Sequence, residues 1–484
     1  MSFLKHMNLE PKLLASTRKL SGWQLAKAIM ILGIPLIVGE LGSIAQQFAD
    51  TMMVGHYGTQ ELAAAGFVNS IFYFVIFLTL GMSYASTPMV GSAFGKKDYK
   101  GVFRIFLESC IVNLIVGLFF VALLLAIYFN IEILFFNTGS GIFHQPYEIL
   151  ALSKDYMMLL IISIPFMTLF YACKQYLDGV GNTQISMWVM LFANILNIGL
   201  NWCLIFGHCG FEPMGLHGAG LSTLISRIIQ LALIGVVVYR NKTINSELEN
   251  AYADELKPTR KGILEQLKLG WPISVQLGLE IGAFNVCGIF MGWLGALPLA
   301  AHQAMYTIST LCFQVLYGIG AAGSILMSQF YGMKAWKNIR KTANTAFIVG
   351  LLSVTAITGC IWLFFEPLAG CFTNDKEVIN LMWLVLPSFI AYQLGDCTQI
   401  VYANALRGIE DTKPLAFISG LAYVVVCIPI SYIIAFKLDL GVAGVWMGIP
   451  IGLSLAGILF FARFRSKLLD LMEKTLYGNH HMNL

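Results

Sequence analysis

Charged side chains are scarce in this sequence. Only 12% of its 484 residues are Asp, Glu, Lys or Arg, 57% are hydrophobic, and the mean hydropathy is +0.74. Water-soluble domains are about a quarter charged, so this composition excludes a soluble domain. The apolar segments also lack the alternation of apolar and polar residues that membrane β-barrels show. The composition therefore predicts an all-α polytopic membrane protein.

The motifs of several large function classes are missing as well. The ten cysteines include no CxxC pair, which predicts small buried apolar residues rather than disulfides or metal ligands. No Walker motif is present, so we expect no use of ATP. Neither a nucleophile–base pair nor an HExxH-like motif is visible, which argues against an enzyme. We also expect no covalently bound cofactor, no nucleic-acid partner and a monomeric protein.

What the sequence does contain is a series of long apolar runs separated by short polar loops. We predict twelve membrane spans, near residues 27–54, 61–86, 103–128, 155–177, 184–206, 218–239, 264–293, 298–327, 342–365, 379–406, 414–436 and 441–462. The N-terminal segment lacks the apolar core of a signal peptide, so we expect the first span to serve as the insertion signal.

The distribution of Lys and Arg predicts the orientation of these spans. If both termini are cytoplasmic, the inner segments carry 26 Lys and Arg residues, the outer loops carry only 3, and Arg227 alone is left within a span. The positive-inside rule therefore predicts cytoplasmic termini. The predicted order is a cytoplasmic segment (1–26), a six-helix bundle (27–239), a cytoplasmic linker (240–262), a second six-helix bundle (263–463) and a cytoplasmic tail (464–484).

The two predicted bundles are related in sequence. Residues 32–100 align with residues 269–337 without a gap and share sixteen identities. Because each bundle has an even number of spans, both copies enter the membrane in the same sense. This predicts parallel repeats about a pseudo-twofold axis along the membrane normal, with the substrate path between them. The identities include Pro35/Pro272, Gly81/Gly318 and Gly95/Gly332.

Five ionisable residues lie well inside the predicted spans: Glu40, Asp50, Arg227, Glu280 and Asp396. Charge at such positions is costly, and it is usually retained for function. Four of the five are acids, and a mainly acidic cavity in apolar surroundings favours cations and repels anions. We therefore predict that the substrate, the coupling ion, or both are cationic. Aromatic residues, 13% of the chain, would suit flat organic cations wherever they line the cavity.

The first half contains one predicted cation-coupling site. Asn194, Asn197 and Asn201 share one face of span 5, and Thr223 lies about one turn into span 6, at a depth similar to that of Asp50. Their oxygens form a hard ligand set suited to Na⁺, and the same set binds a proton when the carboxylate is protonated. We predict a site at Asp50, Asn197, Asn201 and Thr223, with Asn194 as a secondary member. The alternative is that these amides only hold helices together.

The second half contains different acids. Glu280 lies in span 7 and Asp396 in span 10, each near mid-span, and Gln393 close to Asp396 is a secondary candidate. The equivalents of the three asparagines are apolar or nearly so: Tyr423, Val426 and Ile430. We therefore expect the two halves to share a scaffold but not a site.

Glu40 and Arg227 each allow two interpretations. Glu40 precedes Asp50 by ten residues, roughly 15 Å along a helix. It is either a second cation-binding group or a partner for Arg227, and Arg227 is more often a tethering residue than a ligand.

Four separated segments resemble one known family. They are PLIVGELGSIAQQFADTMMVGHYGTQELAA, WPISVQLGLEIGAF, LAAHQAM and YQLGDCTQIVYANALRGIEDTKP, and the resemblance extends from about Trp23 to Arg465. The sequence is similar to the multidrug and toxic compound extrusion (MATE) transporters, with the NorM-type branch looking closest.

This resemblance implies two six-helix bundles that export organic cations in exchange for inward Na⁺ or H⁺, in the bacterial inner membrane. Asp50 matches the family's span 1 aspartate, and Glu280 and Asp396 match the second-half acids assigned to cation coupling. Asn197, Asn201 and Thr223 look like the positions that complete the first-half site. Some relatives have an aspartate where this chain has Asn201, so the site here carries one carboxylate fewer.

The expected mechanism is alternating access, in which a cationic drug and a coupling ion compete for the same acids or for two conformations that the acids bias. The nearest alternative is a lipid-linked precursor flippase on a related two-bundle scaffold. Its anionic substrate would require several arginines in the cavity, whereas Arg227 is the only arginine well inside a predicted span.

Overall fold

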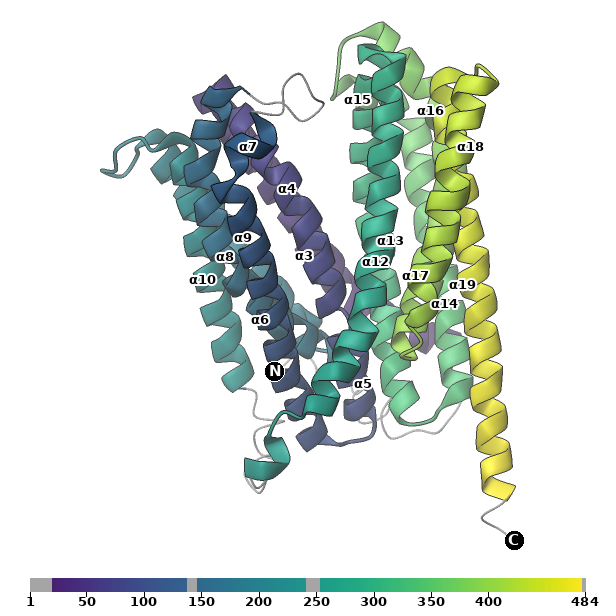
Figure 1. The fold of residues 1–484 in the computed structure, drawn as a ribbon. Helices are drawn as coiled ribbons and strands as arrows, with labels where there is room; N and C mark the ends of the chain where they lie inside the picture. The colour runs from purple at the N-terminus through teal and green to yellow at the C-terminus, as the bar shows by residue number, and fades with distance from the viewer. Residues whose placement is uncertain (1–19, 137–145, 241–252, 481–484) are drawn as a thin grey trace. The chain divides into compact units, whose positions relative to one another are not determined.

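The computed structural model describes residues 20–136, 146–240 and 253–480 (Figure 1). Within these ranges the chain is helical and has no strand. Twelve helical segments in the described part of the chain are long and apolar enough to cross a membrane, which confirms the predicted number. The protein is therefore an all-α, multi-pass membrane protein.

The first six spans run from α3 to α10. They are α3 (Gly22–Tyr57), α4 (Thr59–Ser83) followed by α5 (Ser86–Gly95), α6 (Tyr99–Phe129), α8 (Tyr147–Gly179), α9 (Thr183–Phe206) and α10 (Gly215–Tyr239), with a short α7 (Ile131–Phe135) after α6.

The last six spans follow a short 3₁₀ helix, η1 (Ala253–Leu256). They are α12 (Arg260–Leu294), α13 (Ala296–Gly332), α14 (Trp336–Leu363) with the short α15 (Phe365–Gly370), α16 (Lys376–Gly408), the segment from α17 (Lys413–Ser419) to η3 (Ile433–Lys437), and α19 (Gly441–His480).

Several helices extend beyond the predicted span ends, and α19 does so most clearly. It continues through much of the segment predicted as a tail, as the yellow helix in Figure 1 shows. Residues 458–477 contain neither glycine nor proline. The helix therefore has no stop signal near the predicted end at 462. The hydropathy pattern marks the apolar stretch, whereas the helix itself ends later.

The eleventh span is not a regular α-helix. After the α-helical turns of α17, wider π-helical turns form η2 (Gly420–Cys427) and η3. The short α18 (Ile428–Tyr432) between η2 and η3 is α-helical. Pro429 has no backbone N–H, and its ring crowds the carbonyl one turn earlier. The π turns of η2 accommodate this loss, since such turns are the usual response to a disturbed hydrogen-bond ladder.

The chain folds into two compact units, which we call unit 1 and unit 2. Unit 1 comprises Met1–Ile37, Gly91–Asp98 and Val275–Leu484, and unit 2 comprises Val38–Val90 and Tyr99–Ser274. The first helix of each predicted bundle thus changes unit partway along, α3 after Ile37 and α12 after Ser274. These two positions are equivalent in the repeat alignment. The domain boundaries proposed from sequence remain a prediction.

The glycines shared by the two repeats allow equivalent close helix contacts. In unit 1, a Cβ on Gly318 would collide with the side chain of Ile37, and in unit 2, a Cβ on Gly81 would collide with Ser274. Gly81 aligns with Gly318, and Ile37 aligns with Ser274. Glycine is therefore required at both positions for the same reason: the neighbouring helix passes where a side chain would be.

Each unit buries its own apolar core. In unit 2, α4, α6, α8 and α10 contribute side chains such as Phe72, Leu124 and Met157 to one buried cluster. In unit 1, α16 packs against α13 and α19. Trp446 and Phe389 are among the largest fully buried side chains there. These packed helices hold the acids described below.

Candidate cation-coupling site

Unit 2 contains a cavity of about 220 Å³ lined by residues of α3, α4, α8, α9 and α10. Five of the residues predicted from sequence line it: Asp50, Asn194, Asn197, Thr223 and Arg227. Tyr73, Tyr156 and Phe170 contribute aromatic walls. The helical spacing predicted from sequence therefore brings the expected polar residues together at one cavity.

A chain of hydrogen bonds links the Asp50 carboxylate to the asparagines of α9. The Asn201 amide Nδ2 donates to Asp50 Oδ1 at 2.5 Å and lies 3.2 Å from Asn197 Oδ1. Gln46 Nε2 lies 3.5 Å from the other carboxylate oxygen, Oδ2. Because Asn197 is fully buried and Asn201 is 1% exposed, amide dipoles rather than water solvate this side of Asp50.

The hydroxyl that completes this chain comes from Ser222 and not from the predicted Thr223. Ser222 donates to Asn201 Oδ1. Thr223 lines the cavity, but its Oγ1 donates to the backbone oxygen of Ala219 at 3.0 Å. Sequence spacing did not separate these neighbours, because one residue changes the helix face by only about 100°.

The set of polar atoms fits a small cation. Nδ2 of Asn194 and Nδ2 of Asn197 are buried and have no hydrogen-bond partner among the described residues. An asparagine amide that turns about its last torsion exchanges its nitrogen for its oxygen. With this turn, Asn194 and Asn197 each offer an oxygen to the cavity that Asp50 lines, which is the hard ligand type that Na⁺ prefers, and the carboxylate alone accepts a proton.

Arg227 does not pair with Glu40, contrary to one of the two alternatives raised by the sequence. Its Nη1 donates to Ser163 Oγ at 2.5 Å, and it lies within electrostatic range of Asp50. Arg227 thereby ties α10 to α8 next to the cavity, as its interpretation as a tethering residue predicts.

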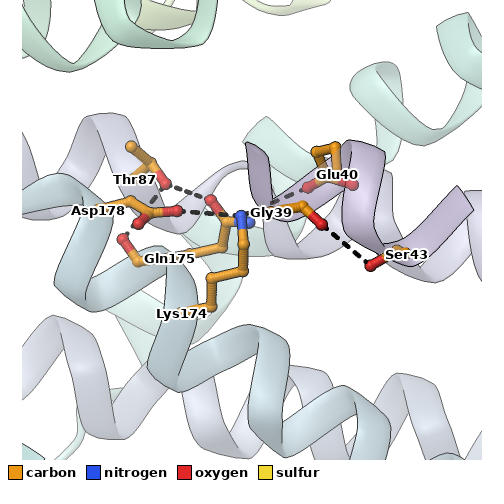
Figure 2. A network of polar contacts seen from close by, with 7 residues as sticks. All are labelled: Gly39, Glu40, Ser43, Thr87, Lys174, Gln175 and Asp178. Carbon is orange, nitrogen blue, oxygen red and sulfur yellow. Dashed lines mark hydrogen bonds and ion pairs between the residues drawn. The ribbon is translucent and has the colours of Figure 1, made fainter. Parts of the chain in front are cut away.

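Glu40 instead belongs to a polar network with α8 that the sequence did not reveal (Figure 2). Its Oε1 lies 3.6 Å from Lys174 Nζ, and the same ammonium group donates to Asp178 Oδ2 at 3.1 Å. Lys174 is one of the 26 cations that the charge distribution assigns to the inner segments, yet it falls within the predicted span 155–177, lies inside α8 and is only 5% exposed. Its pairing with Asp178 at i, i+4 was the available signal.

Unit 1 holds the second group of acids on α12 and α16. Glu280 Oε2 accepts a hydrogen bond from Gln399 Nε2 at 3.1 Å, and Asp396 Oδ2 lies 3.4 Å from the Tyr392 hydroxyl. Asp396 is fully buried and Glu280 is 6% exposed. The two carboxyl groups lie within electrostatic range of each other. The structure thus brings together the two acids that the sequence places 116 residues apart.

Several polar atoms around these acids have no hydrogen-bond partner among the described residues. They are Oδ1 of Asp396, both amide atoms of the predicted secondary residue Gln393, and the hydroxyl of Tyr423. Each of these side chains is at least 99% buried. Because an unpaired buried polar group is costly, this region is suited to accept a further polar or charged ligand.

Arg407 was also counted among the loop cations and is in fact buried, at 4% exposure. Its Nη2 donates to Gln276 Oε1 at 3.0 Å, and it lies within electrostatic range of Glu280. Gln276, Tyr392, Gln399 and Arg407 were not singled out from the sequence. Gln399 follows Asp396 by three residues, so its helical spacing was a usable signal.

Comparison with known proteins agrees with this architecture. The MatE family model matches residues 35–203 and 272–433. The probable multidrug resistance protein NorM of Agrobacterium fabrum is 28% identical over 446 residues, covering 90% of this chain and 93% of that protein. The multidrug resistance protein NorM of Vibrio cholerae is 28% identical over 445 residues, covering 90% and 94%.

Solved structures of low sequence identity share the fold. The outward-facing conformation of a multidrug resistance MATE family transporter of the MOP superfamily has a TM-score of 0.82 at 21% identity, covering 94% of this chain and 100% of that one. A MOP superfamily transporter from Pyrococcus furiosus, described as having a binding pocket of reverse polarity, has a TM-score of 0.80 at 22% identity, covering 94% and 99%. Since the MatE model matches more than half of the sequence, this chain belongs to the MatE family.

Proposed function

We propose that this protein is a multidrug efflux transporter that exports organic cations in exchange for inward Na⁺ or H⁺. Its curated relatives are named as multidrug resistance proteins, which supports the general class. The residues of this chain support the cationic substrate and the coupling.

The observation that carries the proposal is the environment of Asp396. Its carboxyl group is fully buried, Oδ1 has no hydrogen-bond donor among the described residues, and Glu280 is a nearby acid. A buried carboxylate is stable when it is protonated or bound to a cation, and least stable when bare. The site therefore favours an exchange in which one cation leaves only as another arrives.

Asp50 supplies a carboxylate with the same proposed role in unit 2. Its hydrogen bonds to Asn201 and Gln46 are those of a carboxylate held by neutral donors, and the adjoining cavity has aromatic walls. In the proposed cycle, an organic cation is released outward when Na⁺ or H⁺ binds at Asp50, Glu280 and Asp396. Neutralised sites then permit return to the inward-facing state.

The membrane and orientation belong to the same proposal. We place the protein in the bacterial inner membrane as a monomer with both termini cytoplasmic, because the positive-inside rule applied to the predicted loops favours this orientation. Cys371 is exposed at the end of α15 and would then face outward. An impermeant thiol reagent applied to intact cells should label Cys371 in a variant that keeps no other cysteine. Labelling only after lysis would contradict the orientation.

Transport in proteoliposomes tests the function. Vesicles loaded with a fluorescent organic cation receive either a Na⁺ gradient or a pH gradient, and the wild type is compared with Asp50→Asn and Asp396→Asn. We expect efflux from wild-type vesicles under one of the two gradients. In both variants gradient-driven efflux should fall about 100-fold or to background, because an amide carries no negative charge for Na⁺ or H⁺ to neutralise. If folded wild-type protein gives no efflux under either gradient, drug export is wrong and the flippase alternative is favoured.

A further inference from the structure

The network around Lys174 lies outside the Asp50 cavity and carries an unbalanced charge (Figure 2). It contains two carboxylates, Glu40 and Asp178, and one ammonium group, Lys174. With all three groups ionised, one negative charge is left over. The other side chains drawn with them, Ser43, Thr87 and Gln175, are neutral.

The geometry assigns the surplus charge to Glu40. Lys174 and Asp178 are hydrogen-bonded at 3.1 Å on one helix, and their side chains are only 6% and 4% exposed. Glu40 comes from α3, lies at the longer distance of 3.6 Å from the ammonium group, and is 22% exposed. Lys174 and Asp178 therefore form a neutral buried pair, and Glu40 is the accessible acid beside it.

A purely structural role does not explain this second acid. One carboxylate is enough to balance a buried lysine, and each further buried charge adds a desolvation cost. An uncharged polar residue on α3 would also bridge the helices. Within the same network, Oδ1 of Asp178 and Nε2 of Gln175 are buried and have no hydrogen-bond partner among the described residues. The network thus has surplus negative charge and one unused carboxylate oxygen, Oδ1 of Asp178, whereas the amide nitrogen of Gln175 is a donor and does not bind a cation.

Glu40 is also connected to the Asp50 site by the pattern of α3. Glu40, Ser43, Gln47 and Asp50 follow one another at i, i+3, i+7 and i+10, which places them along one slowly turning face of the helix. Ser43 and Gln47 line the same cavity as Asp50. A polar row therefore leads from the cavity to Glu40, over roughly 15 Å.

The two ends of this row offer a cation different environments. At Asp50 the hydrogen-bond donors are the neutral amides of Asn201 and Gln46, and the cation within electrostatic range, Arg227, donates to Ser163 instead. At Glu40 an ammonium group already lies 3.6 Å from the carboxylate and repels any added cation. A small cation therefore binds less tightly at Glu40 than at Asp50.

We propose that Glu40 is a second, weaker site for a small monovalent cation, from which the ion bound at Asp50 is released toward the end of unit 2 where α8 meets α9. Lys174 sets the affinity of this site. The inference rests on the proposed exchange of cations, and in the proposed orientation this end faces the cytoplasm.

The test measures transport currents from proteoliposomes on a solid-supported membrane after a Na⁺ jump or a pH jump. Lys174→Met should lower the half-saturating concentration of whichever cation drives the current by about tenfold or more. The reason is that the ammonium group of Lys174 no longer competes with that cation for the Glu40 carboxylate. Glu40→Gln should slow turnover and reduce the maximal current. The double variant Glu40→Gln/Lys174→Met should match Glu40→Gln, since Lys174 acts only through Glu40.

Further variants separate this role from a structural one. Lys174→Met/Asp178→Asn removes both members of the neutral pair, so it leaves no unpaired buried charge if Lys174→Met alone fails to fold. It should show the same affinity shift. Lys154→Met, on the same helix in a partly exposed pair with Glu132, should leave the half-saturating concentration unchanged.

Two results would overturn the inference. One is an unchanged half-saturating concentration in the variants that lack Lys174, with stability and current lowered alike, as expected for a simple tether. The other is an affinity shift that persists in the Glu40→Gln background. Absence of current from the wild type under both jumps would instead contradict the proposed function itself.

Discussion

At the scale of single residues, the carboxyl groups inside the spans accept hydrogen bonds from neutral side chains. Asp50 is held by amides, Asp396 by one tyrosine hydroxyl, and Glu280 by a glutamine. Neutral donors stabilise a carboxylate less completely than an ion pair does, so the affinity for an incoming cation is preserved. Arg227 and Arg407 lie within electrostatic range of Asp50 and Glu280, but they donate hydrogen bonds to Ser163 and Gln276. At Glu40 the ammonium group of Lys174 lies 3.6 Å from the carboxylate and weakens that affinity.

The contrast between Ser222 and Thr223 gives a residue-scale prediction. Ser222→Ala removes the donor to Asn201 Oδ1, so it should raise the half-saturating concentration of the coupling cation by about 2- to 10-fold, the value of one hydrogen bond. Thr223→Val should change it less: both hydroxyls lie within hydrogen-bond distance of the backbone oxygen of Ala219, but only that of Ser222 also reaches Asn201. Cation-dependent efflux measured over a range of Na⁺ concentrations or pH checks both. A larger effect of Thr223→Val would show that Thr223 is the ligand.

Sequence patterns predicted the position of these groups better than their partners. Helical spacing was sufficient to place Asp50 and Asn201 together, since both periodicity and depth follow from the helix rise. The choice between Ser222 and Thr223 depends on side-chain rotamers, which spacing does not specify. Lys174 is assigned to the inner segments by the charge distribution because it lies in the last turns of a predicted span, where a buried lysine and a loop lysine have the same sequence context.

At the scale of helices, glycine determines which elements approach closely. On α19, Gly444, Gly448 and Gly452 recur at every fourth residue and face residues 427–435. A Cβ on Gly448 would lie 2.7 Å from the backbone nitrogen of Ser431, which is too close for any side chain. This row lets α19 pack against the irregular eleventh span, whose π turns no periodicity argument predicted.

Replacement of one glycine of this row gives an element-scale prediction. Gly448→Ala should destabilise the protein by about 1–3 kcal/mol, because overpacking moves the helices apart. Gly359→Ala on α14 is the matched control, since a Cβ there meets no atom within 4 Å. Thermal unfolding in detergent, followed by a fluorescent thiol dye or by circular dichroism, compares the two. Equal melting temperatures for both variants would show that the contact is loose.

At the scale of the whole molecule, apolar length and loop charge were sufficient to predict twelve helical spans, because a membrane leaves the backbone few alternatives. The internal repeat is reflected in paired contacts such as Gly81–Ser274 and Gly318–Ile37. The acids do not follow the repeat: Glu40 aligns with Leu277 and Asp50 with Cys287. A duplicated scaffold thus carries sites that diverged separately, which is why the sequence repeat predicts the fold but not the chemistry.

The central claim is that movement of an organic cation and movement of Na⁺ or H⁺ are obligatorily linked in opposite directions. Thermodynamic linkage makes this reciprocal, so a gradient of the organic cation alone should drive the ion. The measurement follows intravesicular Na⁺ and pH with trapped indicators after an organic cation is added outside ion-equilibrated proteoliposomes. We predict that one of the two ions leaves the vesicles as the organic cation enters, and that Asp396→Asn abolishes this countermovement. Entry of the organic cation with no movement of either ion would contradict the account.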